Sequence, residues 1–542
     1  MSWQTVKNFN MAGELNLSEL LVLTWALVLI TGMQALPAQA QLTELYAFQY
    51  NAATTSNFPD GANPMAELIQ GADGDYYTTT NIGGAGACPG EVEGQIPGCG
   101  AVVKITPAGA LSVLYSFPYD SSSSSAPNGW FPEAGLVQGR DGNFYGVASE
   151  GGTATESSCA DTTGLSGCGT VFKLTPSGTI TVLHSFCGGG GCGSLATDGA
   201  EPTGRMVFGA NGDLYGTTQV GGLYNGFYNQ GMIFRITTSG AYKVLHLFSG
   251  NFGSKPDGAN PAAGLILASN GDFYGTTTAG GASEDGTVFK MTPAGKVTLL
   301  HSFTGSSDGS MPIGALVQAS DGNLYGTCYS GGANGTGTVF RITTKGVFTK
   351  IYDFAAEAAP GNIGYLPRAG LIQASDGNLY GTAWQGGAFT ATGTIYQLTL
   401  GGVGTLEASF DASTTGFSPL GALLQGSDGR LYMTLQYNGG ENSDGVQDQG
   451  AISVLDLGLS PPAPGPFEFT PAKGLVGAKI TLRGSAFVGT TAVTFNGTSA
   501  ASVVDASGYV TATVPAGATS GTISVTNAGG TTTSKSSFTV LP

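Results

Sequence analysis

The chain has 542 residues, of which 90 are glycine and only 10% are charged. This composition suits short strands joined by tight turns and disfavours long helices. Against 36 acidic residues stand 19 basic ones, which gives a net charge of −17. Because nucleic-acid binding depends on clustered Lys and Arg that neutralise phosphates, the charge balance argues against it.

The first 40 residues are typical of a signal peptide. The apolar run 20–33 is shorter than the roughly 20 residues that a membrane span needs, and Ala38-Gln39-Ala40 has the spacing of a cleavage site. We expect cleavage after Ala40 and export to the periplasm, the cell surface or the medium. The leading region carries one lysine against two glutamates, so a later start at Met11 or retention as an anchor stays open.

Three short patterns then recur seven times. The first is a Gly-rich turn that ends in an aromatic residue, at Tyr77, Tyr145, Tyr215, Tyr274, Tyr325, Tyr380 and Tyr432, with spacings of 51 to 70 residues. The second, Gly-x-Val/Ile-x before Thr-Pro or Thr-Thr, starts at Gly100, Gly169, Gly231, Gly286, Gly337, Gly393 and Gly450. The third, Leu-His/Tyr-x-Phe, ends at Phe48, Phe117, Phe186, Phe248, Phe303, Phe354 and Phe410.

Each unit predicts four short antiparallel strands. Asp-Gly and Asn-Gly pairs between apolar runs, as at Asp321-Gly322, predict two-residue hairpins of type I′. Thr-Pro-x-Gly supplies a second turn. Four strands at a period near 50 residues indicate the blade of a β-propeller.

The opening stretch QLTELYAFQY contains the third pattern before any turn, and no third pattern follows the last unit. Pairing a strand from one terminus with the last blade removes an exposed sheet edge. We therefore predict that residues 45–48 pair beside residues 451–455, and that residues 41–458 form a seven-bladed, all-β propeller. A linear solenoid is the alternative, and it would leave this seam open.

The seven cysteines are consistent with an oxidising compartment. Six lie in close pairs in Gly-rich loops, which predicts three local disulfides: Cys88 with Cys99, Cys159 with Cys168, and Cys187 with Cys192. Cys328 is left over. Its slot holds mostly small residues in the other units, which favours a buried apolar role over a reactive thiol.

The motifs GLVQ-x-x-DG-x-x-YG-T and GTVF-[KR]-[LIM]-T-P-x-G-x-x-x-x-LHSF resemble the tandem GloVer (Gloeo/Verruco) repeat of exported bacterial proteins. The last copy departs from this repeat at Met433 and Leu435. The resemblance implies export and a repeat architecture, but no activity.

A Pro-rich linker at residues 459–466 precedes a different pattern. Residues 467–542 alternate short strands and turns, such as Ile480-Thr481-Leu482 before Gly484, and resemble an IPT/TIG domain, an immunoglobulin-like sandwich. Such domains occur in surface proteins and in DNA-binding factors. With few basic residues here, the resemblance implies a spacer or adhesion role.

The histidines do not form a metal site in the sequence pattern. His184, His246 and His301 occupy one slot of the fourth strand in successive units, where other units have tyrosine. We expect a packing role, with a hydrogen bond from the ring to a neighbouring strand. Copper oxidases of the galactose oxidase type share the expected architecture, but their His and Tyr ligands do not carry over, because the carboxy-terminal domain has no histidine.

Four aspartates fall in an Asp-Gly-x-x-Pro pattern, at Asp60, Asp198, Asp257 and Asp308. An Asp-Gly pair indicates a turn before it indicates a metal site. A calcium site would need several converging oxygen ligands, with loop carbonyls helping. We predict no catalytic, cofactor or metal residues, and calcium remains as an alternative.

The loop lengths favour one face for binding. The loops at residues 81–99, 149–168, 118–132 and 187–203 are long, and the predicted strand order puts them on the same face. The aromatic candidates for ligand contact are Trp130, Phe131, Tyr224, Phe227 and Tyr228. The sequence therefore favours an exported, non-enzymatic protein that binds a glycan or an extracellular protein. An extracellular carbohydrate-active enzyme, a hydrolase or lyase, is the first alternative, and a purely structural surface protein is the second.

Overall fold

The computed structural model describes residues 41–49, 58–85, 98–118, 126–153, 167–187, 198–224, 227–228, 230–250, 256–356, 362–388, 392–411, 415–437, 450–465, 467–484, 486–504 and 509–542. In these residues all regular secondary structure is β-strand, so the all-β prediction is confirmed. Within the same ranges, no helix is long and apolar enough to span a membrane. The predicted signal segment, 1–40, lies outside the described residues.

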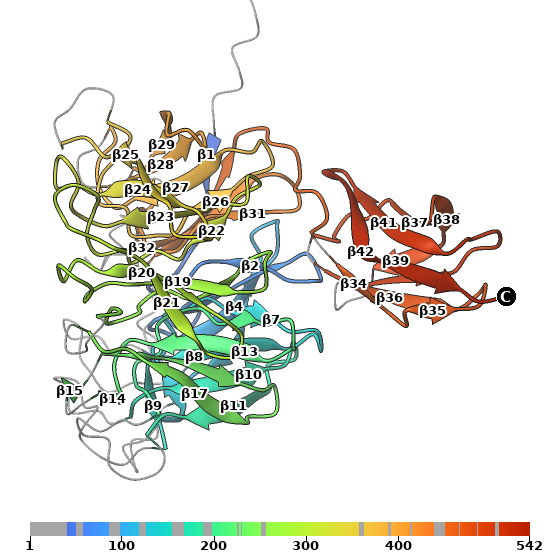
Figure 1. Ribbon diagram of the computed structural model, residues 1–542, viewed down its shortest axis with the longest axis horizontal. Helices are drawn as coiled ribbons and strands as arrows, with labels where there is room; N and C mark the ends of the chain where they lie inside the picture. Colours follow the sequence, from blue (N-terminus) through green and yellow to red (C-terminus); the bar gives the residue numbers. More distant parts are fainter. Residues whose placement is uncertain are drawn as a thin grey trace, which may run out of the picture. The chain divides into compact units, whose positions relative to one another are not determined.

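Seven sheets contain the repeats and follow one another along the chain (Figure 1). Sheet 1 contains β2 (Ile69–Gln70), β3 (Tyr76–Thr80), β4 (Ala101–Ile105) and β5 (Leu111–Ser116). Sheet 2 contains β7 (Val137–Gln138), β8 (Phe144–Ala148), β10 (Thr170–Leu174) and β11 (Ile180–Ser185), and sheet 3 contains β12 (Val207–Phe208), β13 (Leu214–Thr218), β16 (Met232–Ile236) and β17 (Tyr242–Leu247).

The next sheets repeat this order. Sheet 4 contains β18 (Ile266–Leu267), β19 (Phe273–Thr277), β20 (Thr287–Met291) and β21 (Val297–Ser302); sheet 5 contains β22 (Val317–Gln318), β23 (Leu324–Cys328), β24 (Thr338–Ile342) and β25 (Phe348–Asp353). Sheet 6 contains β26 (Ile372–Gln373), β27 (Leu379–Ala383), β28 (Thr394–Leu398) and β29 (Gly404–Ser409). Sheet 7 contains β30 (Phe417–Pro419), β31 (Leu424–Gln425), β32 (Leu431–Tyr437), β33 (Ala451–Asp456) and β1 (Gln41–Ala47).

The opening strand closes sheet 7, as the sequence predicts. β1 lies next to β33 in the hydrogen-bonding order, although the two are separated by almost the whole repeat region. The Phe48 backbone nitrogen donates to the Gly450 carbonyl at 3.0 Å, and the Phe48 side chain is fully buried. The first and last parts of the repeat region therefore share one sheet.

The second and third strands carry the core. In six of the seven sheets, all five residues of the second strand are buried, as in β8 and β13. The third strand is buried except at its fourth residue, and the fourth strand is largely half-buried. Strands that are covered on both faces read as continuous apolar runs, which explains the VFK and VFR stretches of the repeat.

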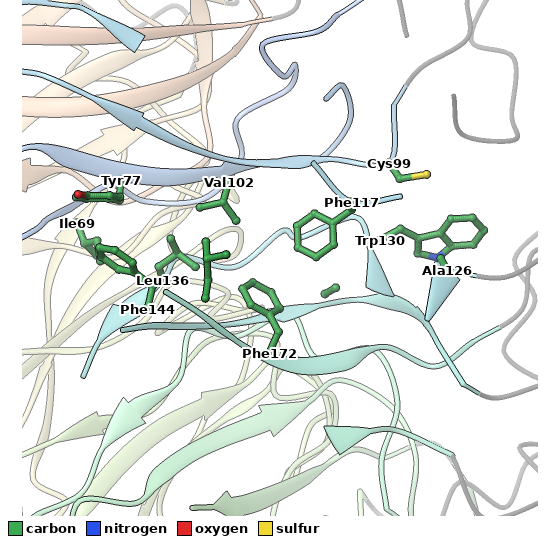
Figure 2. Close-up of a cluster of buried hydrophobic side chains, with 12 residues drawn as sticks. Ile69, Tyr77, Cys99, Val102, Phe117, Ala126, Trp130, Leu136, Phe144 and Phe172 are labelled. Atoms are coloured by element: carbon green, nitrogen blue, oxygen red, sulfur yellow. The ribbon is translucent and has the colours of Figure 1, made fainter. Parts of the chain in front are cut away.

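Neighbouring sheets pack through aromatic side chains. Between sheets 1 and 2, Phe117 and Phe172 meet with ring centroids 5.4 Å apart, and Tyr77 packs on Phe144 at 4.3 Å (Figure 2). Sheets 7 and 1 are joined in the same way, since the ring of Tyr432 lies 4.1 Å from that of Tyr76. The described sheets therefore contact their neighbours in sequence, and the last contacts the first.

The first turn of each unit differs from the prediction. In sheet 5, Gly322 donates its backbone N–H to the Ala319 carbonyl at 2.9 Å, and only Gly322 of the pair has a positive φ, 80°. A type I′ turn requires positive φ at both central residues, so that prediction is wrong. The Asp321 carboxylate accounts for the difference, because it accepts the Tyr325 hydroxyl (2.8 Å) and the Asn323 backbone N–H (3.0 Å).

The same contact recurs in the other sheets and explains why turn and tyrosine recur together. The tyrosine hydroxyl bonds to an Asp or Asn four residues earlier, in the pairs Tyr77–Asp73, Tyr145–Asp141, Tyr215–Asn211, Tyr274–Asn270, Tyr380–Asp376 and Tyr432–Asp428.

The carboxy-terminal strands form two further sheets. One contains β34 (Glu468–Thr470), β36 (Lys479–Arg483), β40 (Val510–Thr513) and β39 (Ser502–Val504); the other contains β35 (Lys473–Gly474), β42 (Gly530–Val540), β41 (Gly521–Asn527), β37 (Ala492–Phe495) and β38 (Thr498–Ala500). They enclose a separate core that includes Ile480, Leu482, Phe495 and Phe538. Two sheets around one apolar core give the predicted immunoglobulin-like sandwich.

The described cysteines are buried. Cys99 and Cys168 are disulfide-bonded, while their predicted partners, Cys88 and Cys159, lie outside the described residues. Cys187 is also buried, and its predicted partner Cys192 lies outside them as well. The three pairings therefore stay predictions. Burial raises the pKa of the Cys328 thiol, whose side chain is fully enclosed, which fits the apolar role expected for it.

Candidate binding site

One residue in every repeat adopts a left-handed backbone conformation directly before a proline. We call these seven residues the pre-proline ring: Asn63, Phe131, Glu201, Asn260, Met311, Leu366 and Ser418, with φ between 50° and 60°. Six of them precede the first strand of their sheet, and Ser418 lies in β30 and precedes β31. A left-handed conformation costs a residue other than glycine roughly 1 to 2 kcal/mol, so the surrounding structure must hold it.

Backbone hydrogen bonds on both sides hold five of the seven ring residues: Phe131, Glu201, Asn260, Met311 and Leu366. Leu366 donates its N–H to the Thr336 carbonyl of sheet 5 at 2.8 Å, and its own carbonyl accepts the Trp384 N–H of sheet 6 at 3.2 Å. The same pair of bonds recurs from sheet to sheet, and the disulfide-bonded Cys99 and Cys168 supply the carbonyls for Phe131 and Glu201. These five residues are thus fixed between two neighbouring sheets.

The ring residues lie at one end of the sheets, which we call the ring end. The first strand runs away from this end to the turn with the Asp–Tyr contact, and the second strand runs back. Residues that follow the second strand, such as Tyr329 and Trp384, therefore return to the ring end beside the ring residues. The predicted long loops also start here, but most of their residues lie outside the described part of the chain.

A contact across non-adjacent sheets shows that the segments between ring and first strand face a common centre. Arg205 of sheet 3 places its Nη1 3.4 Å from Glu67 Oε1 of sheet 1. Gly135 of the intervening sheet 2 makes room, since a Cβ there would lie 2.7 Å from the Glu67 Cδ. Side chains that follow the ring in different sheets therefore point toward the same region.

Arg368 is the most unusual cation of the ring end. It lies two residues after Leu366, and its guanidinium stacks over Trp384 (4.7 Å to the ring centroid) and Tyr329 (5.3 Å). Its Nε is buried and has no hydrogen-bond partner among the described residues. No Asp or Glu among the described residues forms an ion pair with Arg368.

Two acids lie at the ring end of sheets 2 and 3. Glu133 follows Phe131 by two residues, and burial together with the nearby negative charge of Glu201 raises the pKa of Glu133 to about 7. Burial also raises the pKa of Glu201. Two carboxyl groups with raised pKa values in one site form a common pattern in binding and catalytic sites.

The predicted aromatic residues fall in different places. Trp130 is 1% exposed and belongs to the core between sheets 1 and 2, in β6 (Ala126–Trp130), which pairs with β9 (Glu150–Gly152); Figure 2 shows it at one end of this core. It therefore has little surface for a ligand. Phe131 is half-buried, stacks on Trp130 at 5.6 Å and is a member of the pre-proline ring.

The other three aromatic candidates form a separate hairpin. β14 (Leu223–Tyr224) pairs with β15 (Phe227–Tyr228) in a two-stranded sheet between the second and third strands of sheet 3. Tyr224, Phe227 and Tyr228 stay predictions as ligand contacts.

The three histidines pair with the aspartates of the Asp-Gly-x-x-Pro pattern. His246 Nε2 lies 2.8 Å from Asp257 Oδ2, and the pairs His184–Asp198 (3.1 Å) and His301–Asp308 (2.9 Å) are equivalent. Tyr46 takes the same place opposite Asp60, at 2.5 Å. The partner is thus a loop carboxylate of the same repeat, and not a neighbouring strand as the sequence suggested.

These pairs bear on the calcium alternative. Asp257 also accepts the Ser249 backbone N–H, so its oxygens already bind the fourth strand. Among the described residues, no group of three or more His, Cys, Asp or Glu side chains is arranged to hold a metal ion. Calcium stays an untested alternative.

A small cavity lies at the turn end. Its volume is about 160 Å³, and its walls include Arg140, Asp141, Phe208 and Thr238. This is below the roughly 300 to 1,000 Å³ typical of ligand pockets.

Comparisons with known proteins agree with the two-part organisation. Residues 158–363 match the Gloeobacter/Verrucomicrobia repeat, and residues 468–540 match the IPT/TIG domain. The chain contains this repeat and an IPT/TIG domain. No curated protein matches the sequence.

Solved structures show only distant similarity to this repeat protein. A fungal alcohol oxidase of the AA5 family in complex with copper is 14% identical with a TM-score of 0.43, and the match covers 89% of this chain and 98% of the oxidase. A luciferin-regenerating enzyme is 14% identical with a TM-score of 0.34, covering 60% of this chain and 91% of the enzyme. A protein of unknown function from Dyadobacter fermentans is 10% identical with a TM-score of 0.36, covering 77% and 99%. These similarities are too low to transfer a function.

Proposed function

We propose that the repeat protein is exported and binds an extracellular glycan through the ring end of its sheets. The Gloeobacter/Verrucomicrobia repeat and the IPT/TIG domain are consistent with a β-rich surface or extracellular protein. The IPT/TIG domain serves as a spacer or attachment module in this proposal. A protein partner at the same end is the alternative ligand.

The observation that carries this proposal is the chemistry of the pre-proline ring. Its backbone is nearly the same in all seven repeats, while its side chains range from Asn and Glu to Phe and Leu. A constant scaffold that presents different side chains at one end is the usual arrangement of a binding surface. Most other left-handed positions in the repeats are glycine.

The neighbouring groups suit sugars. Tyr329 and Trp384 provide aromatic rings, and glycans present flat C–H faces and hydroxyl groups that pack on such rings and bond to amides.

A glycan array with the purified mature chain tests this proposal. We expect binding to a defined set of oligosaccharides, and a loss of roughly tenfold or more in affinity for Trp384→Ala. Leu406→Ala, on the outer strand β29, is the control that should leave affinity unchanged. Retained binding in Trp384→Ala, or binding only to a protein from the same surface, would contradict a glycan site at the ring end.

An extracellular carbohydrate-active enzyme is the second candidate, because Glu133 and Glu201 resemble a paired-acid arrangement. A carboxyl group with a pKa of about 7 is still half protonated near neutral pH, as a general acid must be. A hydrolysis screen on the same glycans separates the two functions. Turnover that disappears in Glu133→Gln would favour the enzyme, and binding without turnover would favour the binding protein.

A further inference from the structure

We propose that the ligand at the ring end is an acidic glycan, whose carboxylate or sulfate group is bound by the Arg368 guanidinium. This inference rests on the proposed glycan-binding function and names the chemical class of the ligand. It starts from a cation that has no anionic partner within the described chain.

Three other arginines of the repeat region have a carboxylate partner within this region. Arg205 pairs with Glu67 at 3.4 Å, Arg235 with Asp213 at 3.5 Å, and Arg430 with Asp428 at 2.6 Å. For Arg368, no carboxylate lies within ion-pair distance among the residues that the structure describes. In a chain with 36 acidic and 19 basic residues, an unpaired arginine is not explained by a shortage of acids.

The aromatic neighbours position the guanidinium. The Arg368 Cζ lies over the rings of Trp384 and Tyr329, at 4.7 and 5.3 Å from their centroids. Stacking uses the π-faces and leaves the N–H edge in the guanidinium plane. This edge presents parallel donors whose spacing matches the two oxygens of a carboxylate or a sulfate group.

Partial burial makes the missing partner costly. The Arg368 Nε is enclosed and makes no hydrogen bond within the described residues. A buried charged donor without an acceptor destabilises the folded protein, so another interaction of Arg368 must offset this cost in free energy. A bound anion would offset part of this cost through its attraction to the guanidinium charge.

The aromatic rings favour a sugar over a simple anion. Tyr329 and Trp384 lie beside the Arg368 guanidinium, and sugars pack their C–H faces on such rings. The combination favours a polymer of uronic acids or sulfated sugars.

Calorimetric titration of the full mature chain with matched tetrasaccharides tests the inference. The probes are tetragalacturonate, its neutral methyl ester, and a sulfated galactan tetrasaccharide. We expect at least one acidic probe to bind tenfold to a hundredfold more tightly than the neutral ester, and the advantage to shrink as salt rises. The better acidic probe identifies the anionic group as carboxylate or sulfate.

Three variants test whether Arg368 is the residue that binds the anionic group. Arg368→Gln should abolish the preference for the acidic probe, and Arg368→Lys should restore only part of it, because lysine keeps the charge and loses the paired donors. Arg341→Gln removes the same charge from β24 near the turn end and should keep the preference. Circular dichroism and thermal unfolding of each variant confirm that the fold is intact.

The outcomes separate this inference from the proposed function. If the chain binds neutral and acidic probes equally, or if Arg368→Gln keeps the acidic preference, the inference is wrong while glycan binding stands. If neither these probes nor any neutral or acidic oligosaccharide of the array binds, both the inference and the proposed function are wrong.

Discussion

At the scale of single residues, the pre-proline ring concentrates backbone strain where the side chains differ most. The chain has 90 glycines and uses them at most left-handed positions, yet none of the seven ring positions is glycine. Glycine would adopt this conformation without steric cost. The side chains of the ring are therefore better explained by a role at the surface than by the needs of the turn.

Met311 allows a direct test of this strain, because its side chain is 42% exposed and contributes little packing. At an ordinary exposed position, glycine is less stable than alanine by roughly 0.5 to 1 kcal/mol. At Met311, whose φ is 56°, we expect the order to reverse, so that Met311→Gly is more stable than Met311→Ala by about 0.5 to 1 kcal/mol. Urea unfolding of both variants measures the difference.

Exposed Lys296, which is not left-handed, is the control position for this comparison. There alanine should be at least as stable as glycine. Equal stability of the two Met311 variants would show that the left-handed conformation carries no cost in this loop.

Glu133 makes stability depend on pH in a defined direction. Its pKa is raised to about 7 in the folded protein, above the value of about 4.3 expected when unfolded. The folded state therefore holds the proton more tightly, and this group stabilises the fold below pH 4.3 and loses that contribution as the pH rises through 7. We expect Glu133→Gln to be more stable than the wild type at pH 8 by about 1 to 3 kcal/mol, and the gain to vanish near pH 4.

Chemical unfolding of both proteins at several pH values between 4 and 8 measures this dependence, and other titrating groups cancel in the difference. Glu284→Gln, at an exposed position, is the matched control and should show no such trend. A gain that does not change with pH would mean that Glu133 keeps an ordinary pKa.

The histidines of the fourth strand act as hydrogen-bond donors to loop carboxylates. Burial alone would raise the pKa of Asp257, but bonds from His246 and Ser249 outweigh it and hold this pKa below its usual value. The repeat at Tyr46 shows that a tyrosine hydroxyl can replace the imidazole. We therefore expect His246→Tyr to be tolerated and His246→Phe to cost about 1 to 3 kcal/mol at pH 7.

The sign of the pH dependence follows from Asp257. A lowered folded pKa contributes stability above the unfolded value of about 3.9, and this contribution is lost as the pH falls through the folded pKa. The deficit of His246→Phe should therefore shrink in acid, as thermal unfolding at pH 3 and pH 7 will show. Equal stability of the Tyr and Phe variants at pH 7 would show that a hydrogen bond from residue 246 to Asp257 does not stabilise the fold.

At the scale of strands and turns, the sequence predicts most of the repeat because its signals are local. The apolar runs of β20 and β24 and the Gly-rich turns lie close together in the chain, so their spacing is sufficient to place four strands per unit. The turn type does not follow from backbone preference, because the deciding contact, Asp321 with the Tyr325 hydroxyl, involves side chains. The recurring tyrosine four residues after each Asp or Asn was the available signal.

The site is less predictable from sequence, because its residues come from distant parts of the chain. Glu133, Glu201 and Arg368 belong to sheets 2, 3 and 6, and only the folded backbone brings them to one end. The prolines of the Asp-Gly-x-x-Pro pattern were visible, but the variable residue before each proline gave no pattern of its own. Aromatic residues in loops suggest binding, so the sequence predicts a ligand surface at Trp130, whereas its position in the core depends on contacts with sheet 1.

At the scale of the whole repeat region, β1 connects the beginning of the chain to its end. It adds the outermost strand to sheet 7, in the place that β29 holds in sheet 6. Without β1, the edge of β33 would be open to pairing with other chains. Closure therefore ties the stability of sheets 1 and 7 to a segment that directly follows the predicted cleavage site.

Phe48 and Phe410 provide a matched test of this closure. Both are fully buried and end the third sequence pattern, and each donates its backbone N–H to the glycine carbonyl before the third strand, Gly450 and Gly393, at 3.0 Å. Phe410 belongs to a sheet formed by consecutive strands, whereas Phe48 belongs to the strand added from the other terminus. If β1 is as firmly packed as β29, each Phe→Ala substitution should cost about 3 to 5 kcal/mol and lower the unfolding temperature in one cooperative transition. Differential scanning calorimetry measures the unfolding of both variants. A cost for Phe48→Ala far below that for Phe410→Ala would show that the amino-terminal strand frays independently of the repeat region. The reason is that the loss of a buried ring lowers the stability of all the sheets only if its strand stays paired until they unfold together.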